Sequence, residues 1–68
     1  MNTILAILIY LNVLIPGNIY YQSFINNTIN NLETQIELIE NDLDQMDTVD
    51  DVDLPQVPFI IIVDDNVG

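Results

Sequence analysis

A run of apolar residues near the start of the chain constrains the fold more than any other feature. Between Ile4 and Ile15 the sequence is ILAILIYLNVLI, and only Asn12 interrupts its apolar character. Apolar side chains would lie all round a helix of this sequence, so such a helix must be buried in protein or in lipid. Twelve helical residues rise about 18 Å, which is short of the ~30 Å hydrocarbon core of a bilayer.

A longer helix from the same starting point would reach across a membrane. If it continued through Pro16 to Tyr21, it would rise about 27 Å, which suffices for a slightly thinned bilayer. Proline kinks a membrane helix without ending it, and Tyr20 and Tyr21 would lie at the level of the lipid headgroups. We therefore expect a transmembrane helix within residues 1–25. The inside-negative membrane potential favours an N-terminus inside and an acidic tail outside.

Three other interpretations of the apolar run stay open. A cleaved signal peptide has this apolar length, with Gly17 near a possible cleavage position, although the usual basic segment before the run is missing. A run rich in Ile, Leu and Val also suits a strand that is buried on both faces of a sheet. The third interpretation is a helix buried in a protein partner.

Apolar residues recur at alternating steps of four and three from Ile25 onwards. This spacing predicts an acidic amphipathic helix over residues 26–48 with the seam of a coiled coil. The seam positions are Ile29, Leu32, Ile36, Ile39, Leu43 and Met46, and the acidic residues beside the seam are Glu33, Glu40 and Asp47. We expect this face to bind a partner, unless the helix lies on the core of its own chain.

The partner expected for this face is a protein with a basic surface. In a parallel homodimer the acidic flanking residues would face one another, and each like-charge contact costs a few tenths of a kcal/mol. Burial of each seam residue contributes about 1.5 kcal/mol or more, which outweighs that repulsion. A homo-oligomer is therefore possible but is not favoured by charge.

The last part of the chain, residues 49–68, is predicted to be an acidic linker and an extended tail. The sequence DTVDDVD at residues 47–53 is typical of a solvated linker, and Pro55 is expected to prevent continuation of the helix. LPQVP at residues 54–58 favours an extended, polyproline-like chain. A short strand-prone run follows, in which Phe59, Ile61 and Val63 could join the exposed sheet edge of another protein. The same run could instead pair with itself or remain a disordered end.

Composition narrows the possible functions. The chain has 68 residues with eleven Asp and Glu, no Lys, Arg, His or Cys, and a formal charge of −11. A nucleic-acid partner is not expected, because there is no basic surface for phosphates. We expect no enzyme and no cofactor, because only carboxylates, tyrosines and hydroxyls are present. We also expect no metal site, because Asp42 and Asp44 match the start of a calcium loop but Met46 and Asp47 break its pattern.

These patterns together predict an all-α, non-globular chain with an apolar helix, an acidic heptad helix and an extended tail containing one short strand-prone segment. The leading functional hypothesis is a small non-catalytic, membrane-anchored accessory subunit that docks its acidic helix and tail on a larger assembly. One alternative is a soluble acidic interaction protein, such as an inhibitor or nucleic-acid mimic that binds a basic groove. Another is a soluble βαβ homodimer with strands at residues 4–11 and 59–63 around a helix at residues 29–46.

Overall fold

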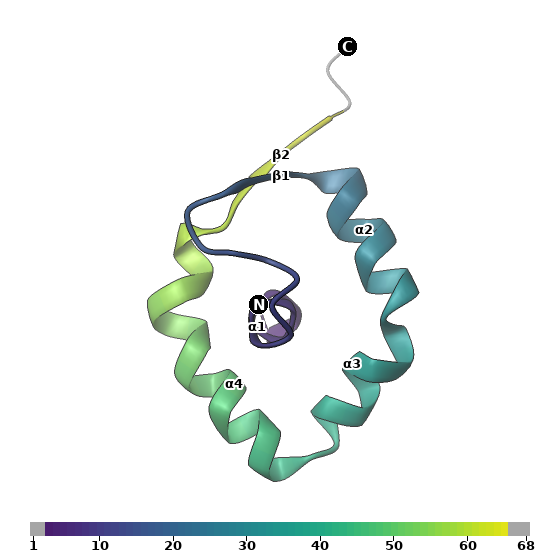
Figure 1. Cartoon of the computed structure of the whole chain (residues 1–68), viewed down its shortest axis with the longest axis vertical. Coiled ribbons are helices and arrows are strands. Elements are labelled where there is room, and N and C mark those ends of the chain that lie inside the picture. The colour runs from purple at the N-terminus through teal and green to yellow at the C-terminus, as the bar shows by residue number, and fades with distance from the viewer. Residues whose placement is uncertain (1–2, 66–68) are drawn as a thin grey trace.

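A computed structural model describes residues 3–65, so the outermost ends of the predicted first and last segments, residues 1–2 and 66–68, lie outside the described part. Four α-helices and two short strands make up most of this part, together with one turn of 3-10 helix (Figure 1). In chain order these elements are α1 (Thr3–Tyr10), β1 (Ile19–Tyr21), α2 (Gln22–Asn31), α3 (Glu33–Glu40), α4 (Leu43–Gln56), the 3-10 turn (Val57–Phe59) and β2 (Ile61–Val63).

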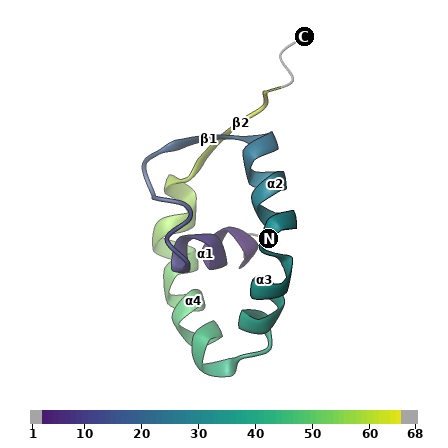
Figure 2. The same cartoon turned by 45° about the vertical axis from the view of Figure 1, so that its right-hand side comes forward.

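The helices form a closed frame around α1. Helices α2 and α3 run in succession along one side, and α4 returns along the other side (Figure 1). Strands β1 and β2 pair at the open end and close the frame, while α1 lies between the two sides (Figure 2). The prediction of an all-α, non-globular chain is therefore wrong, because the helices pack around one another and a two-stranded parallel sheet joins their ends.

The apolar helix is short because a left-handed residue ends it. Asn12 has a φ of 64°. Its N–H donates to the carbonyl oxygen of Ile9 at 2.9 Å, and the N–H of Val13 donates to that of Leu8 at 2.9 Å. These two bonds form a Schellman motif, which satisfies the last carbonyls of a helix and turns the chain aside. The predicted continuation through Pro16 to Tyr21 does not occur.

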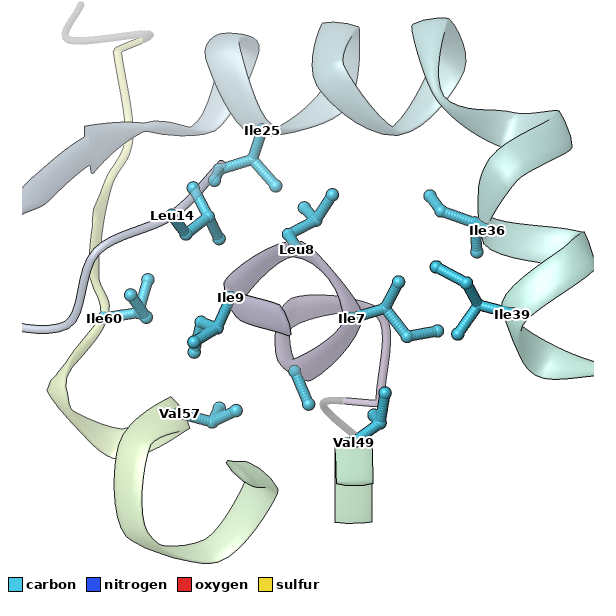
Figure 3. Packing of buried hydrophobic residues seen from close by; sticks show 11 residues of the cluster. Ile7, Leu8, Ile9, Leu14, Ile25, Ile36, Ile39, Val49, Val57 and Ile60 are labelled. Carbon is cyan, nitrogen blue, oxygen red and sulfur yellow. The ribbon is translucent and has the colours of Figure 1, made fainter. Parts of the chain in front are cut away.

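The chain itself buries the middle of the apolar helix on all sides. Ala6, Ile7 and Leu8 have no exposed surface. Ile7 points toward Ile36 and Ile39 of α3, while Ile9 points toward the region of Val57 and Ile60 (Figure 3). The full set of buried apolar residues is Ala6, Ile7, Leu8, Ile9, Leu14, Ile25, Ile36, Ile39, Val49, Val57 and Ile60. An all-round apolar surface thus serves a central helix.

This packing corrects the membrane prediction. None of the helices in residues 3–65 combines the length and the apolar character that crossing a bilayer requires. Helix α1 has 8 residues, which corresponds to a rise of only about 12 Å. The transmembrane helix expected in residues 1–25, and the membrane location with its N-terminus inside and acidic tail outside, are therefore not supported.

The heptad pattern is distributed over three helices. The single coiled-coil helix expected over residues 26–48 breaks at Leu32 and again at Asn41 and Asp42. Asp42 caps α4, because its Oδ1 accepts hydrogen bonds from the N–H groups of Asp44 at 3.1 Å and Gln45 at 3.2 Å. A side chain that satisfies two free N–H groups favours a new helix start at this position. The chain therefore reverses where the seam predicted continuation.

The predicted acidic linker is helical. Helix α4 includes residues 47–53 and continues past Pro55 to Gln56, followed directly by the 3-10 turn. Proline removes one helical hydrogen bond and its ring crowds the carbonyl four residues earlier. Pro55 therefore weakens the last turn of α4 without ending the helix before Gln56. Val49, which has no exposed surface, anchors this segment to the core. The solvated linker and the polyproline-like segment at 54–58 are therefore corrected to a helix.

The strand-prone segment near the end of the chain pairs with another strand of the same chain. Strand β2 pairs in parallel with β1, in the register Ile19 to Ile61, Tyr20 to Ile62 and Tyr21 to Val63. A turn at Pro16 and Gly17 prepares this pairing, because Gly17 has a φ of 94° and its N–H donates to the carbonyl of Phe59 at 2.8 Å. The βαβ alternative placed the first strand at residues 4–11, where the structure has a helix.

Candidate protein-binding groove

The charged side chains of the described chain are all acidic and lie mostly on its surface. Since the sequence contains no Lys, Arg or His, no side chain of the chain itself can neutralise them by an ion pair. The three glutamates of α3 and most aspartates of α4 are exposed. An unbalanced surface of this kind creates a negative potential that attracts cations and basic proteins over several ångströms.

A groove of about 320 Å³ interrupts this surface where the start of α1 meets α2 and α3. Its lining residues are Ile4, Ile29, Asn30, Glu33, Ile36, Glu37 and Glu40. Ile36 is buried and Ile4 and Ile29 are half-buried, whereas the three glutamates are exposed. The groove therefore has an apolar base and a rim that carries carboxylates.

Helical spacing explains why the rim is acidic. Glu33, Glu37 and Glu40 are separated by four and three residues, so they lie along one stripe of α3. Ile36 belongs to the adjacent stripe, which faces α1 and the core. The volume lies at the lower end of the range of about 300–1,000 Å³ found for ligand pockets, so it suits one long side chain better than a large molecule.

The groove has the chemistry of a site for a cationic side chain. No group of three or more carboxylates within residues 3–65 is arranged so that it could hold a metal ion. A Lys or Arg side chain, in contrast, has an aliphatic stem that packs on apolar groups and a charged end that remains near water. The apolar base and the acidic rim complement these two parts.

The structure brings some of the predicted partner-binding residues together and separates others. Ile29, Ile36, Glu33 and Glu40 line the groove. Ile39 is buried, Leu32 and Met46 are half-buried, and Leu43 and Asp47 are exposed on α4. Phe59, Ile61 and Val63 are exposed near the paired strands. Partner binding by these residues stays a prediction, but the seam does not form one continuous exposed face.

Sequence reasoning did not include three residues of the groove, namely Ile4, Asn30 and Glu37. Glu37 had a usable signal, because it lies one turn after Glu33 and three residues before Glu40 on the same helical stripe. The sequence carries no signal that places Ile4 in the groove. Its position there depends on the packing of α1 against a helix about thirty residues away in the sequence.

Two carboxylates outside the groove stabilise helix starts. The side-chain amide of Gln45 donates to Oδ2 of Asp42 at 2.9 Å and, with the backbone N–H groups of Gln45 and Asp44, lowers the pKa of Asp42. The hydroxyl of Ser23 donates to the carboxylate of Asp65 and, with the backbone N–H of Ser23, lowers the pKa of Asp65. The second contact connects the chain two residues after β2 to the first turn of α2.

Comparison with protein-family models, with curated proteins and with solved structures finds no match for this chain.

Proposed function

We propose that the chain is a non-catalytic protein-interaction module that binds a basic partner and receives one of its Lys or Arg side chains in the groove. The observation that carries this proposal is the combination of an apolar base with three carboxylates on the rim, in a chain without any cationic side chain. This function corresponds to the acidic interaction protein that the sequence suggested as an alternative, and it requires no membrane anchor.

The physical contributions to such binding are of two kinds. Packing of an aliphatic stem on Ile4, Ile29 and Ile36 removes apolar surface from water, which contributes about 25 cal/mol for each Å². An exposed ion pair contributes only about 0.2–1 kcal/mol, but several carboxylates on one rim act on the same cation. The negative surface also accelerates encounter with a basic partner, and salt weakens this effect.

A non-catalytic role agrees with the chemistry of the side chains. Carboxylates act as acid and base in enzymes when a partly dry, concave site separates their proton affinities. Here Glu33, Glu37 and Glu40 are exposed at the rim of the groove. The chain also has neither a His nor a Cys that could serve as base or nucleophile.

The test uses a helical Ala- and Lys-rich peptide as the basic probe and isothermal titration calorimetry as the measurement. We expect wild-type protein to bind this peptide, and binding to weaken as NaCl rises. The triple variant Glu33→Gln, Glu37→Gln and Glu40→Gln should lose at least about tenfold in affinity, which corresponds to about 1.4 kcal/mol. A peptide with Glu in place of Lys should not bind.

A matched control separates the groove from the overall charge. The variant Asp47→Asn, Asp50→Asn and Asp51→Asn removes the same number of exposed carboxylates from α4, outside the groove. We expect this control to retain most of the affinity. If both triple variants lose affinity equally, binding is a property of net charge and the groove is not the site. If wild-type protein does not bind the Lys-rich peptide, the proposed function is wrong.

A further inference from the structure

A second exposed feature lies at the sheet end of the molecule and does not involve the groove. In a parallel pair of strands, residues that face each other in the register place their side chains on the same side of the sheet. The register of β1 and β2 therefore puts Ile19, Tyr21, Ile61 and Val63 on one side, which we call the outer face. Tyr20 and Ile62 lie on the opposite side.

On the opposite side, Tyr20 holds β1 to the body of the protein, whereas Ile62 is exposed. The ring of Tyr20 stacks on Phe24 of α2 with a centroid distance of 5.6 Å, and its hydroxyl oxygen accepts a hydrogen bond from the N–H of Ile15 at 2.8 Å. Tyr20 also packs against the buried core. The outer face therefore points away from the core.

The outer face is apolar and open. Ile19 is 65% exposed and Tyr21 is 60% exposed, and Ile61 and Val63 are also exposed beside them. Phe59, just before β2, adds a further exposed ring. Apolar groups gathered in this way on a small protein are a common mark of a surface that another molecule covers.

The edge of β2 is also open for pairing. The sheet formed by residues 3–65 has two strands, so β2 has β1 on one side and no strand on the other. The N–H of Ile61 donates to the carbonyl of Asn18 at 3.3 Å, toward the side of β1. Since backbone groups of successive residues point to alternate sides of a strand, the N–H and C=O of Ile62 point to the open edge.

Charge decides between two kinds of occupant. A second copy of the chain would bring eleven more acidic side chains and no basic side chain, and it would place its own Asp64 and Asp65 near the same edge. A partner segment that carries Lys or Arg beside its apolar residues would meet the opposite charge after β2. Charge complementarity across an interface suppresses wrong partners and accelerates the encounter of the right ones.

We propose that the edge of β2 and the outer face dock an extended, basic segment of a partner protein, which adds a third strand beside β2. The backbone of Ile62 pairs with this strand, apolar residues of the segment contact Ile61 and Val63, and its cationic residues lie near Asp64 and Asp65. This mode of binding combines main-chain hydrogen bonds with side-chain contacts at alternate residues. It does not depend on the groove.

The experiment uses a capped ten-residue peptide of alternating Val and Lys, which places Val on one side of an extended chain and Lys on the other. We expect wild-type protein to bind this peptide in calorimetry. Amide hydrogen exchange should show new protection of the Ile62 N–H in the complex. A peptide of alternating Val and Glu should not bind, and neither should the Val–Lys peptide with N-methyl groups on alternate residues.

A proline substitution tests the edge without removing β1 from its partner. Ile62→Pro deletes the outward N–H, whereas the bonds to β1 come from neighbouring residues, and proline is tolerated at such positions of edge strands. We expect Ile62→Pro to weaken peptide binding by at least about tenfold while the circular dichroism spectrum is retained. Ile61→Thr with Val63→Thr provides a second variant, which keeps β-branched residues but removes apolar surface. Leu38→Gln on α3, an exposed leucine far from the sheet, is the matched control.

The possible results separate this proposal from its alternatives. Absence of Val–Lys peptide binding, or equal binding of the N-methylated peptide, would overturn it. A concentration-dependent dimer that Ile62→Pro dissociates would show that a second copy occupies the edge and would overturn it as well. Loss of binding in the Glu33, Glu37 and Glu40 variant with no effect of Ile62→Pro would assign the peptide to the groove. Loss of Val–Lys peptide binding in Ile62→Pro alone supports docking at the edge of β2, whether or not the groove binds a partner.

Discussion

The hydroxyl of Tyr10 donates a hydrogen bond to the side-chain oxygen Oε1 of Gln45 at 3.0 Å, across 35 positions of sequence. Gln45 also donates from its amide nitrogen to Asp42, the residue that caps α4. The end of α1 is therefore connected to the beginning of α4 through one glutamine. Apolar packing alone does not fix the rotation of α1, and this connection fixes the position of its C-terminal end relative to α4.

Removal of this hydroxyl should destabilise the protein. We expect Tyr10→Phe to lower the free energy of unfolding by about 0.5–1.5 kcal/mol, because the bond is lost and Oε1 of Gln45 keeps no partner on α1. Urea unfolding followed by circular dichroism measures this difference. Tyr21→Phe, which changes an exposed tyrosine outside the core, is the control and should leave the midpoint unchanged. Equal effects of the two substitutions would contradict the role of the Tyr10 bond.

Two leucines test the packing of the helices directly. Leu8 is fully buried, whereas Leu43 is 86% exposed although it belongs to the predicted coiled-coil seam. We expect Leu8→Ala to cost about 2–5 kcal/mol through loss of apolar contacts and formation of a cavity. Leu43→Ala should cost less than about 0.5 kcal/mol. A large cost at Leu43, measured by urea unfolding at several protein concentrations, would show that this residue is covered by another molecule.

Apolar periodicity predicts which residues share one side of a helix, but it does not predict which segment covers that side. The spacing of Ile29, Ile36 and Ile39 indicates that these residues share one side of a helix, and the structure buries Ile36 and Ile39. What covers that side is not contained in the spacing. Helix α1 covers it, which depends on contacts between segments far apart in the chain. For the same reason Ile4 could not be assigned to the groove.

The apolar patterns predict the ends of two helices wrongly, and each error has a local cause. The seam continues in step through Asn41 and Asp42, so apolar spacing conceals the turn there, whereas the capping ability of Asp42 is the signal that marks it. Asn12 is likewise a residue that tolerates left-handed conformation, and its position after eight helical residues is what shortens α1. In both cases a polar residue that favours caps outweighs a hydrophobic pattern that suggests continuation.

The left-handed residue at the end of α1 leads to a prediction about backbone conformation. Asn12→Ala should lower the free energy of unfolding by about 1 kcal/mol, because at positive φ the Cβ atom of alanine crowds the following carbonyl oxygen. Asparagine tolerates this conformation better than alanine does. Asn12→Gly should leave stability equal or slightly higher, since glycine adopts this conformation most readily. Thermal unfolding of the two variants provides the measurement. Greater stability of the alanine variant would indicate that α1 continues past this position.

The two helix-start carboxylates predict a specific dependence on pH. Hydrogen bonds from Gln45 and from Ser23 lower the folded-state pKa values of Asp42 and Asp65 below the ordinary value of 3.8. A lowered folded-state pKa contributes stability that is fully present above the unfolded-state pKa and is lost as pH falls through the folded-state value. Below about pH 4, protonation should therefore weaken both contacts, whereas relief of repulsion among the other carboxylates acts in the opposite direction.

The double variant Asp42→Asn with Asp65→Asn separates these two effects. It removes the two titrating groups, and a matched control that removes two other carboxylates measures the effect of charge repulsion, so the difference between the two variants reports on the contacts. We expect the control to be more stable than the double variant at pH 7 and this difference to shrink as pH falls from about 4 toward 2. Urea unfolding at a series of pH values measures it, with Asp47→Asn and Asp50→Asn as the matched control. A difference that stays constant over this range would show that neither contact depends on the carboxylate charge.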